Sequence, residues 1–399
     1  MLLEFQFKNI YSYRNKGYFS MEAVKGTKKK NEFSKYNSHR ILKSAILFGP
    51  NASGKSNLLK SLRVFRRLVI KDDTQENPFP SYGMKLTPIE LQVVILENKM
   101  VYRYSVKYLP DEIVDEKLEI EENGEFLIYF HRTKLSYTSG NKELLELTSR
   151  ARKDNLFLGV GKAFNDDHCL NVYRWFRNNL IFISKDISPL LKQLHRLQRK
   201  KNFKKRFLNF LQAADINISN FEVVESISKI ESELSFLLDK RSEFKHYDML
   251  LRHEFSGDFV DDKYFTLKLG DESDGTQKLI ALAIIILSFE GKTILIDEFD
   301  DSLHLELSKS LIDLFNCEEN QNQFILTSHE LALMDCDFKK EQIYLTDREN
   351  SGESDLFSIY DFRSEENRRD YSYLKRYKNG MFGAVPDVLK MKLRQALKE

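Results

Sequence analysis

The chain has 399 residues, of which 62 are lysine or arginine and 60 are aspartate or glutamate, so its formal net charge is only +2. This length allows one large or two to three ordinary domains, and the charge balance excludes an overall electrostatic signal for a nucleic-acid partner. The three cysteines, Cys169, Cys317 and Cys336, have no C-x-x-C spacing, which argues against zinc or disulfides and suits a reducing cytoplasm.

The N-terminal region is predicted to contain a phosphate-binding loop. The segment Gly49-Pro50-Asn51-Ala52-Ser53-Gly54-Lys55-Ser56 is a complete G-x-x-x-x-G-K-[ST] motif. It follows an apolar run, 44–48, that predicts a buried strand, and it precedes residues 57–65, which have the apolar spacing of a helix. In such a turn, backbone N–H groups surround phosphate oxygens at the positive end of the helix. The motif therefore predicts that the chain binds a nucleoside triphosphate.

Residues of this loop have specific expected roles. Lys55 is expected to reach the β- and γ-phosphates, and the Ser56 hydroxyl is expected to ligate Mg²⁺. ATP and Mg²⁺ are thus the predicted cofactors. The residues expected to bind the nucleotide from this part of the chain are Gly49, Asn51, Ser53, Gly54, Lys55, Ser56 and Asn57.

The middle of the chain is predicted to be β-rich at first and then helical. Residues 86–130 alternate apolar and polar side chains, with Asn98-Lys99 and Asn123-Gly124 where turns are needed, which predicts an antiparallel meander. Long polar faces predict helices over 171–179, 190–213 and 227–251. The expected domains are an N-terminal part over 1–65, a β-rich subdomain over 66–143, a compact helical insertion over 144–258 and a C-terminal part over 259–399.

A basic cluster lies in the predicted helical part, together with Phe203 and Phe207. One interpretation is a surface that contacts the phosphates of DNA or RNA, or an acidic partner. The other is a solvated helix face whose phenylalanines turn towards the core. No sequence motif of a nucleic-acid-binding domain accompanies the cluster, so a nucleic-acid partner stays an open alternative. The basic residues are Lys192, Arg196, Arg199, Lys200, Lys201, Lys204, Lys205 and Arg206.

The segment Ser273-Asp274-Gly275-Thr276-Gln277 leads into an apolar run, 278–288, that is predicted to be a helix. A serine at a helix start commonly acts as a cap, because its side chain accepts a hydrogen bond from a free N–H group of the first turn. Anion binding uses the same N–H donors. Capping and phosphate binding are therefore compatible interpretations of Ser273 and Gly275.

Two later apolar runs end in candidate catalytic residues. The run 293–296 is followed by Asp297 and Glu298, the form of a Walker B segment. Asp297 is expected to hold the Mg²⁺ shell, and Glu298 to polarise the attacking water as general base. The run 323–328 precedes His329, and a histidine at a strand end beside phosphate can sense the γ-phosphate and position water. Glu298 and His329 are the predicted catalytic residues.

The order of these segments resembles that of ABC-type ATPases of the SMC, RecF and OLD branch rather than of membrane transporters. In that family the signature Ser and Gly cap the γ-phosphate of ATP bound to the partner subunit, which is the role implied for Ser273 and Gly275. Asp274 and Thr276 depart from the transporter form L-S-G-G-Q, whereas S-D-G-T is similar to the form in bacterial defence ATPases. In the place of the family's D-loop, residues 299–304, His304 either contacts the opposing site or belongs to a plain surface loop.

Further segments resemble the RloA/AbiLi group of bacterial ATPases. Residues 2–13 are similar to the strand that opens RecF and OLD-type ATPases and begins a β-subdomain beside the adenine. Residues 377–386 resemble a tail, Y-x-x-G-x-[FY]-G-A-V-P, that recurs in the RloA/AbiLi group, and 87–91 and 101–106 also look like that group. The resemblance implies an α/β fold, namely an ABC-ATPase head with a mixed central sheet, an antiparallel β-subdomain and a compact helical insertion.

The same resemblance implies an ATP-hydrolysing homodimer or higher homo-oligomer that regulates a separate effector, a Toprim-like nuclease or toxin, in abortive infection against phage. Only about 40 residues follow Tyr360, too few for a Toprim domain within this chain. The alternative is a RecF- or SMC-like ATPase that binds DNA in repair or chromosome maintenance. We find no signal peptide and no apolar run of roughly 20 residues, so a cytoplasmic protein without a membrane partner is expected.

Overall fold

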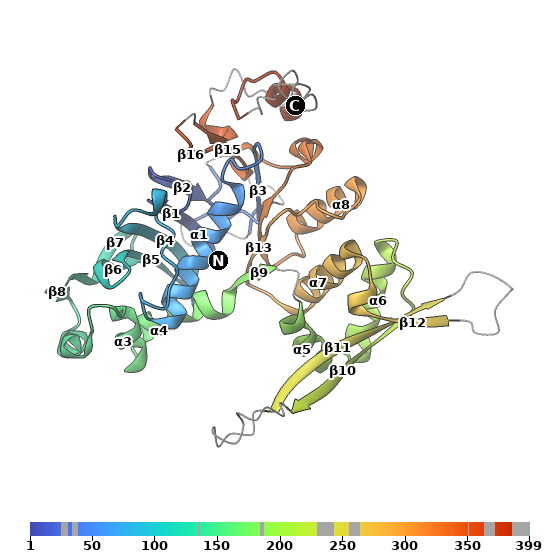
Figure 1. Ribbon diagram of the computed structural model, residues 1–399, viewed down its shortest axis with the longest axis horizontal. Helices are drawn as coiled ribbons and strands as arrows, with labels where there is room; N and C mark the ends of the chain where they lie inside the picture. The colour runs from blue at the N-terminus through green and yellow to red at the C-terminus, as the bar shows by residue number, and fades with distance from the viewer. Residues whose placement is uncertain are drawn as a thin grey trace, which may run out of the picture. The chain divides into compact units, whose positions relative to one another are not determined.

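The computed structural model describes residues 1–24, 31–33, 39–134, 136–183, 187–229, 243–254, 264–349, 351–362 and 372–384. The chain divides into two compact units. The first contains Met1–Phe182, Gly291–Asp300 and Ser308–Glu399, and the second contains Ile183–Glu290 and Asp301–Leu307 (Figure 1).

A seven-stranded antiparallel sheet forms one layer of the first unit, in the order β2-β1-β4-β5-β6-β7-β8. Its β4–β5 turn has left-handed φ values of 48° at Asn98 and 64° at Lys99, and its β6–β7 turn has 53° at Asn123 and 87° at Gly124. Two left-handed residues in a row suit a two-residue hairpin turn. The predicted meander is confirmed, and the N-terminal strands join it. The strands are β1 (Leu2–Lys8), β2 (Gly17–Ser20), β4 (Ile89–Glu97), β5 (Met100–Leu109), β6 (Glu112–Glu122), β7 (Glu125–Thr133) and β8 (Ser136–Ser139).

A six-stranded mixed sheet forms the other layer, in the order β16-β15-β3-β14-β13-β9. Strands β13, β14, β3 and β15 are parallel, and β16 is antiparallel to β15. The carboxyl ends of parallel strands meet at one edge, so the segments that follow β3, β13, β14 and β15 gather there. The predicted mixed α/β fold is confirmed. The strands are β3 (Ser44–Phe48), β9 (Leu180–Ile183), β13 (Thr293–Ile296), β14 (Gln323–Thr327), β15 (Ile343–Arg348) and β16 (Ser354–Ser358).

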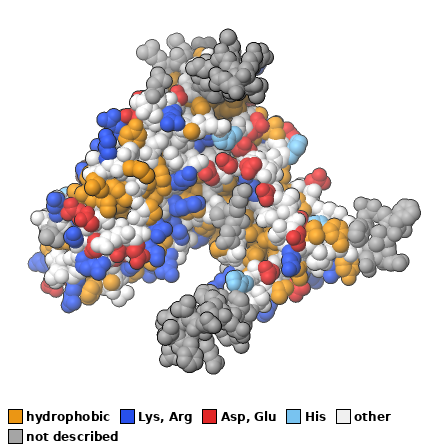
Figure 2. All heavy atoms as spheres, in the orientation of Figure 1, with side chains coloured by type: hydrophobic (Ala, Val, Ile, Leu, Met, Phe, Trp, Pro, Cys, Tyr) orange, Lys and Arg blue, Asp and Glu red, His pale blue; other side chains and the backbone are white. Residues whose placement is uncertain are grey.

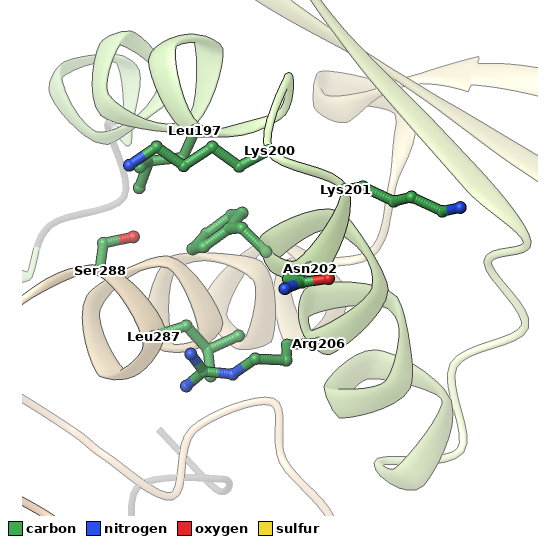
Figure 3. Close-up of a pocket in the computed structure, with 8 residues that line it drawn as sticks. Leu197, Lys200, Lys201, Asn202, Arg206, Leu287 and Ser288 are labelled. Carbon is green, nitrogen blue, oxygen red and sulfur yellow. The ribbon is translucent and has the colours of Figure 1, made fainter.

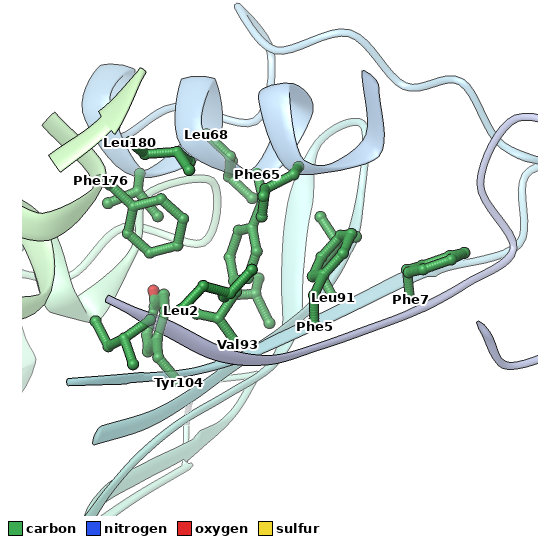
Figure 4. Packing of buried hydrophobic residues seen from close by; sticks show 14 of the residues in the cluster. Leu2, Phe5, Phe7, Phe65, Leu68, Leu91, Val93, Tyr104, Phe176 and Leu180 are labelled. Carbon is green, nitrogen blue, oxygen red and sulfur yellow. The ribbon is translucent and has the colours of Figure 1, made fainter. Parts of the chain in front are cut away.

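Helix α1 (Lys55–Lys71) supplies much of the core of the first unit. Figure 4 shows Phe65 and Leu68 of this helix facing Phe5 and Val93 of the seven-stranded sheet. The stacked rings of Phe65 and Tyr104 have centroids 5.8 Å apart. Among the described residues, the other α-helices of this unit are α2 (Lys142–Glu146), α3 (Phe157–Ala163), α4 (Asp167–Arg174) with a π-helical turn (Trp175–Asn179), most of α8 (Leu305–Asn316), and α9 (Tyr373–Lys378).

The buried Gln323, the first residue of β14, links the two sheets. Its Oε1 accepts the backbone N–H of Leu2 at 2.9 Å, and its Nε2 donates to the carbonyl oxygen of Leu2 at 2.9 Å. Nε2 also donates to Leu42 O at 3.2 Å. The side-chain amide thus acts as a peptide group would, and it satisfies backbone groups of Leu2, a residue that pairs with β4 but has no partner in β2.

In the residues that the structure describes, the second unit combines three α-helices with a three-stranded sheet. The helices are α5 (Ser188–Leu197), α6 (Lys201–Ala213) and α7 (Asp274–Ser288), and the strands, in the order β10-β11-β12, are β10 (Asn220–Lys229), β11 (Glu243–Glu254) and β12 (Tyr264–Lys268). Residues of α5, α6, α7, β10 and β11 share one hydrophobic core.

The helix predicted over 227–251 is wrong in the part that the structure describes. Residues 227–229 and 243–251 belong to the antiparallel pair β10–β11. Phe221 and Val223 are buried whereas Glu222 and Val224 are exposed, which is the two-residue period of a half-buried strand. The polar residues that suggested one face of a helix belong instead to paired strands. The insertion is therefore mixed rather than helical.

The described part of the C-terminal tail is fixed to the first unit. The backbone N–H of Ala384 donates to Oδ2 of Asp347 at 2.9 Å, and the hydroxyl of Tyr377 donates to the carbonyl oxygen of Ala384. The last residues of the predicted tail motif, Val385 and Pro386, lie outside the described residues. Among the described helices, none is both long enough and apolar enough to span a bilayer.

Candidate nucleotide-binding site

The phosphate-loop motif lies between β3 and α1, as its flanking residues predicted. Gly49 and Gly54 have φ values of 151° and 117°. Residues that carry a Cβ rarely adopt such backbone angles. A Cβ on Gly49 would lie 2.3 Å from the carbonyl oxygen of Thr346, and one on Gly54 would lie 2.6 Å from Oγ of Ser354. Both glycines are therefore required by the backbone and by its neighbours.

Lys55 is a buried lysine at the start of α1. Its Nζ donates to the carbonyl oxygens of Gly49 at 2.7 Å and Pro50 at 2.9 Å, so the ammonium group lies over the loop that precedes it. Burial lowers the pKa of Lys55, whereas the negative charges of Asp297 and Asp300 act to raise it. These acids keep Lys55 charged, and an ammonium group inside a loop is suited to bind a polyphosphate.

Ser56 and Asp297 meet although they are far apart in sequence. The Ser56 hydroxyl donates to Oδ1 of Asp297 at 2.9 Å, and Thr327 Oγ1 donates to the same oxygen at 2.6 Å. Oxygen is the ligand type that Mg²⁺ prefers, and this ion commonly uses only one or two protein ligands beside substrate phosphates. The pair therefore fits the predicted Mg²⁺. The described residues contain no larger His, Cys, Asp or Glu group that could hold a metal by itself.

The predicted catalytic residues follow β13 and β14 at the same edge of the sheet. Glu298 is exposed and has a left-handed φ of 49°, an uncommon conformation for glutamate that is often found at functional sites. His329 is exposed, and its backbone N–H donates to Oδ1 of Asp300 at 3.2 Å. The N–H of Glu330 donates to Oδ2 of Asp300 at 3.0 Å. Figure 2 shows acidic side chains gathered where β13 leads towards α8.

Three of the residues predicted to bind the nucleotide differ in how exposed their side chains are and in what those side chains contact. Asn51 is exposed in the loop. Ser53 is buried, and its Oγ lies 2.5 Å from Oγ1 of Thr346, so only its backbone is available to a nucleotide. The amide of Asn57 donates to Oγ of Ser12 at 2.8 Å and thus holds the N-terminal segment against α1.

Several residues that support the loop had no role predicted from the sequence. Tyr13 is buried, and its hydroxyl donates to the carbonyl oxygen of Gly54 at 3.1 Å. Ser354 donates to Oγ of Ser12 at 2.7 Å, and Thr346 contacts Ser53 as described above. These residues come from the two ends of the chain. Their types and spacing carry no motif, so only the folded structure identifies them.

The predicted signature residues belong to the second unit. Ser273 is the N-cap of α7, and its Oγ accepts the N–H of Thr276 at 3.1 Å. Gly275 is in close contact with the D-loop, because a Cβ on it would lie 2.4 Å from the carbonyl oxygen of Ser302. The preceding residue, Glu272, is paired with His253, with Oε1 and Nε2 2.6 Å apart. Capping of α7 by Ser273 is thus present, and Gly275 has a steric role within its own chain.

His304 contributes to the start of α8. Its Nδ1 accepts the backbone N–H of Glu306 at 3.3 Å, and the side chain is exposed. This contact anchors the ring at the end of the D-loop. Contact with an opposing site stays a prediction.

Comparison with known families identifies the group to which this arrangement belongs. A family described as "AAA domain, putative AbiEii toxin, Type IV TA system" matches residues 44–335, which includes the phosphate loop, Ser273, Asp297 and His329. The chain belongs to this AAA family. The match does not separate the RloA/AbiLi group from other AAA proteins, so that finer resemblance stays a prediction.

Solved structures similar to this AAA protein include three SMC heads. One is the SMC head bound to the C-winged helix domain of ScpA, with 15% identity, a TM-score of 0.44, and coverage of 94% of this chain and 99% of that chain. Another is the SMC head domain from Thermotoga maritima, with 16% identity, a TM-score of 0.39, and coverage of 90% and 98%. The third is the Smc head domain with an extended coiled coil bound to the C-terminal domain of ScpA, derived from Pyrococcus furiosus, with 14% identity, a TM-score of 0.43, and coverage of 90% and 96%. No curated protein matches the sequence.

Proposed function

We propose that this AAA protein binds Mg²⁺-ATP and hydrolyses it in a head-to-tail homodimer whose opening and closing regulates a partner protein. The observation that carries the proposal is the contact of Ser56 with Asp297 at 2.9 Å beside the phosphate loop. Two oxygen ligands next to a buried lysine form a site for a metal-bound triphosphate.

The proposed roles follow from the positions of the side chains. Lys55 would leave its two loop carbonyls and bind phosphate oxygens. Ser56 and Asp297 would hold Mg²⁺, whose positive charge would offset charge on the phosphates. Glu298 would accept a proton from the attacking water, and His329 would orient that water near the γ-phosphate.

The proposed dimer makes use of Ser273 at the first turn of α7. Free N–H groups at a helix start bind anions, and Ser273 is exposed there. In a head-to-tail dimer, this turn of one subunit would close over the γ-phosphate held by the other. ATP then stabilises the dimer, and hydrolysis releases it.

A mixed-dimer experiment tests this arrangement. The variant Lys55→Ala is expected to lose phosphate binding, and Ser273→Asn keeps a helix cap but replaces the hydroxyl. We expect each variant alone to be inactive, whereas co-expressed subunits with different tags regain ATP hydrolysis, because one of the two composite sites is intact. If the mixture stays inactive while both variants fold, the signature does not act on a neighbouring subunit.

A second experiment tests the catalytic assignment. Glu298→Gln should bind ATP normally and accumulate as an ATP-bound dimer in size-exclusion chromatography with Mg²⁺-ATP. Glu298→Gln hydrolysing ATP at the wild-type rate would disprove the general-base role.

The regulated partner is proposed to be a separate nuclease or toxin acting in anti-phage defence. The family description, which names a putative toxin and a toxin–antitoxin system, supports this direction. Co-purification of the tagged Glu298→Gln variant from its native cell would test it, since the trapped dimer should retain a partner that the Lys55→Ala variant does not.

The alternative function is that of a DNA-binding ATPase of repair or chromosome maintenance. The exposed basic residues of α5 and α6 support this alternative, because a cluster of cations attracts the phosphates of DNA. Stimulation of ATP hydrolysis by DNA, in the absence of any partner protein, would support this alternative. Stimulation only by a partner protein would support the defence function.

A further inference from the structure

The turn between α5 and α6 carries a dense group of exposed cations. We call this surface the basic corner; it consists of Lys192, Arg196, Arg199, Lys200, Lys201, Lys205 and Arg206, all of which are exposed. The neighbouring Phe203 and Phe207 are buried in the core shared with α7. The phenylalanines therefore turn inwards, as one interpretation of the sequence expected, and the charged side chains remain outside.

The basic corner is not neutralised by acids of its own chain. Within the described residues, none of its seven side chains forms an ion pair. Elsewhere on the surface, cations do pair, for example Lys107 with Glu90 at 3.1 Å and Arg14 with Glu353 at 2.8 Å. An uncompensated cluster of one sign produces a local positive potential that attracts anionic partners.

A hollow of about 510 Å³ is next to the basic corner and has no acidic residue in its lining. Figure 3 shows Lys200 along its upper side and Arg206 next to Leu287 of α7 along its lower side, with Ser288 of α7 between the two sides. Oγ of Ser288 has no hydrogen-bond partner among the described residues. A second hollow of about 620 Å³ borders the corner on its β10 side and is lined in part by Glu222 and Glu225, which would repel an anion. The first hollow is therefore the better path for phosphate groups.

The electrostatics of α6 point in the same direction. Lys200 and Lys201 are at the N-terminal end of this 13-residue helix, and its first turn contains no acid. Cations at the positive end of a helix are unfavourable unless an anion balances them. A bound phosphate would relieve this repulsion.

The chemistry of the corner favours nucleic acid over a protein or a lipid surface. Protein interfaces and membrane-bound helices use exposed apolar anchors. Among the described residues, the exposed large hydrophobic side chains of the second unit are Val224, Tyr264 and Phe265, and none of these is on α5 or α6. A nucleic-acid backbone, by contrast, carries closely spaced negative charges and needs only cations to bind it.

We propose that the basic corner binds the phosphate backbone of DNA or RNA, with Lys200, Lys201 and Arg206 as its central contacts. Because these contacts are made to phosphates, the binding is independent of base sequence. The proposal goes beyond ATP hydrolysis and does not require it, since no residue of the corner belongs to the proposed ATP site.

Fluorescence anisotropy with the full chain and labelled single-stranded and duplex oligonucleotides of DNA and RNA tests the proposal. The test variant combines Lys200→Glu, Lys201→Glu and Arg206→Glu. The control variant combines Lys85→Glu, Lys142→Glu and Arg150→Glu, which changes the net charge equally at exposed positions of the first unit. A milder variant with Gln at the three corner positions covers the case in which charge reversal impairs folding.

We expect the wild type to bind at least one of these nucleic acids with an affinity that falls steeply with salt. The corner variant should lose about tenfold or more in affinity, and its slope in a plot of log K against log salt should be shallower by about 2 to 3. The control variant should bind like the wild type. Equal losses in both variants would show a net-charge effect and overturn the proposal, as would unchanged binding in the corner variant.

The proposal would also be overturned if the protein bound an acidic polypeptide such as polyglutamate but none of the oligonucleotides. That result would assign the basic corner to an acidic protein partner. ATP hydrolysis without nucleic acid, measured on the same samples, should be unchanged in the corner variant. If the wild type binds oligonucleotides but does not hydrolyse ATP, that result would count against the proposed ATPase activity and not against the basic corner.

Discussion

The hydroxyl of Thr327 donates to Oδ1 of Asp297 at 2.6 Å and at the same time accepts the backbone N–H of Glu298 at 2.8 Å. One side chain on β14 thus positions both acids that follow β13. The contact can form because β13 and β14 are parallel neighbours that end at the same edge. Thr327 is a positioning residue for the proposed Mg²⁺ ligand and the proposed base.

Replacing Thr327 by valine should slow ATP hydrolysis without abolishing ATP binding. Valine keeps the shape of threonine but removes a hydrogen bond to a charged group, which is worth about 1.5–3 kcal/mol. That corresponds to roughly a 10- to 100-fold lower turnover rate. Steady-state ATPase assays and nucleotide titration would measure the two effects. Thr327→Ser, which keeps the hydroxyl, is the matching control and should hydrolyse ATP at nearly the wild-type rate. Wild-type turnover in Thr327→Val would contradict the positioning role of Thr327.

Asp300 should affect hydrolysis through His329. Its carboxylate accepts the N–H groups of His329 and Glu330, so Asp300→Ala would free the turn that carries the histidine. We expect a fall in turnover of about tenfold, with little change in ATP affinity, from the loss of about 1.4 kcal/mol of positioning. The neighbouring Asp301→Ala, also in the D-loop, should behave like the wild type. An equal effect of both substitutions would show that only the local charge matters.

Gly275 should be needed for stability even without a second subunit. A Cβ at this position would meet the carbonyl oxygen of Ser302 at 2.4 Å, so Gly275→Ala must displace α7 or the D-loop. We expect a loss of about 1–3 kcal/mol in the unfolding free energy, as for other overpacked positions. Gly270→Ala, where no atom lies within 4 Å of the added Cβ, is the control in urea denaturation. A stable Gly275→Ala that loses ATPase activity would instead indicate a role confined to the partner's phosphate.

Gln323→Leu should destabilise the first unit. The substitution keeps the side chain similar in size but leaves the buried N–H and C=O of Leu2 without their partner. Each unsatisfied buried group costs about 1–3 kcal/mol, so a lower midpoint of chemical denaturation is expected. The exposed neighbour Gln321→Leu should change the unfolding free energy by no more than about 0.5 kcal/mol. Identical midpoints for both variants would contradict the bridging role.

Asp72 should make the unfolding free energy depend on pH. Burial raises its pKa from 3.8 to about 6, although its carboxylate accepts the N–H of Leu156. Between these two pKa values, the folded state holds a proton that the unfolded state has released. The contribution of Asp72 to the unfolding free energy is therefore full below pH 3.8 and is lost as the pH rises through about 6. Asp72→Asn should reduce this fall between about pH 4 and 6, measured by urea unfolding at each pH. Parallel curves for the two proteins would disprove the assignment.

Local segments of this protein were predictable because their signals are contiguous. The phosphate loop is eight consecutive residues between an apolar strand and an amphipathic helix, and each glycine is required by backbone geometry at its own position. The meander of β4 to β7 was predictable from two-residue alternation and from turn residues that tolerate positive φ. For β10 and β11, by contrast, the spacing of charges suggested a helix, because pairing with a partner strand is not visible in either segment alone.

By itself the sequence determined the nucleotide motif, the acids after β13 and the histidine after β14, since each depends on residues that are adjacent in the chain. Only the tertiary structure decided that Thr327 holds both acids, that Thr346 and Tyr13 support the loop, and that Gly275 lies against Ser302. It also decided that the phenylalanines of the basic stretch are buried while its cations stay unpaired. The physical reason is that these contacts join segments brought together only when the sheets and helices pack, and such contacts leave no periodic pattern in the chain.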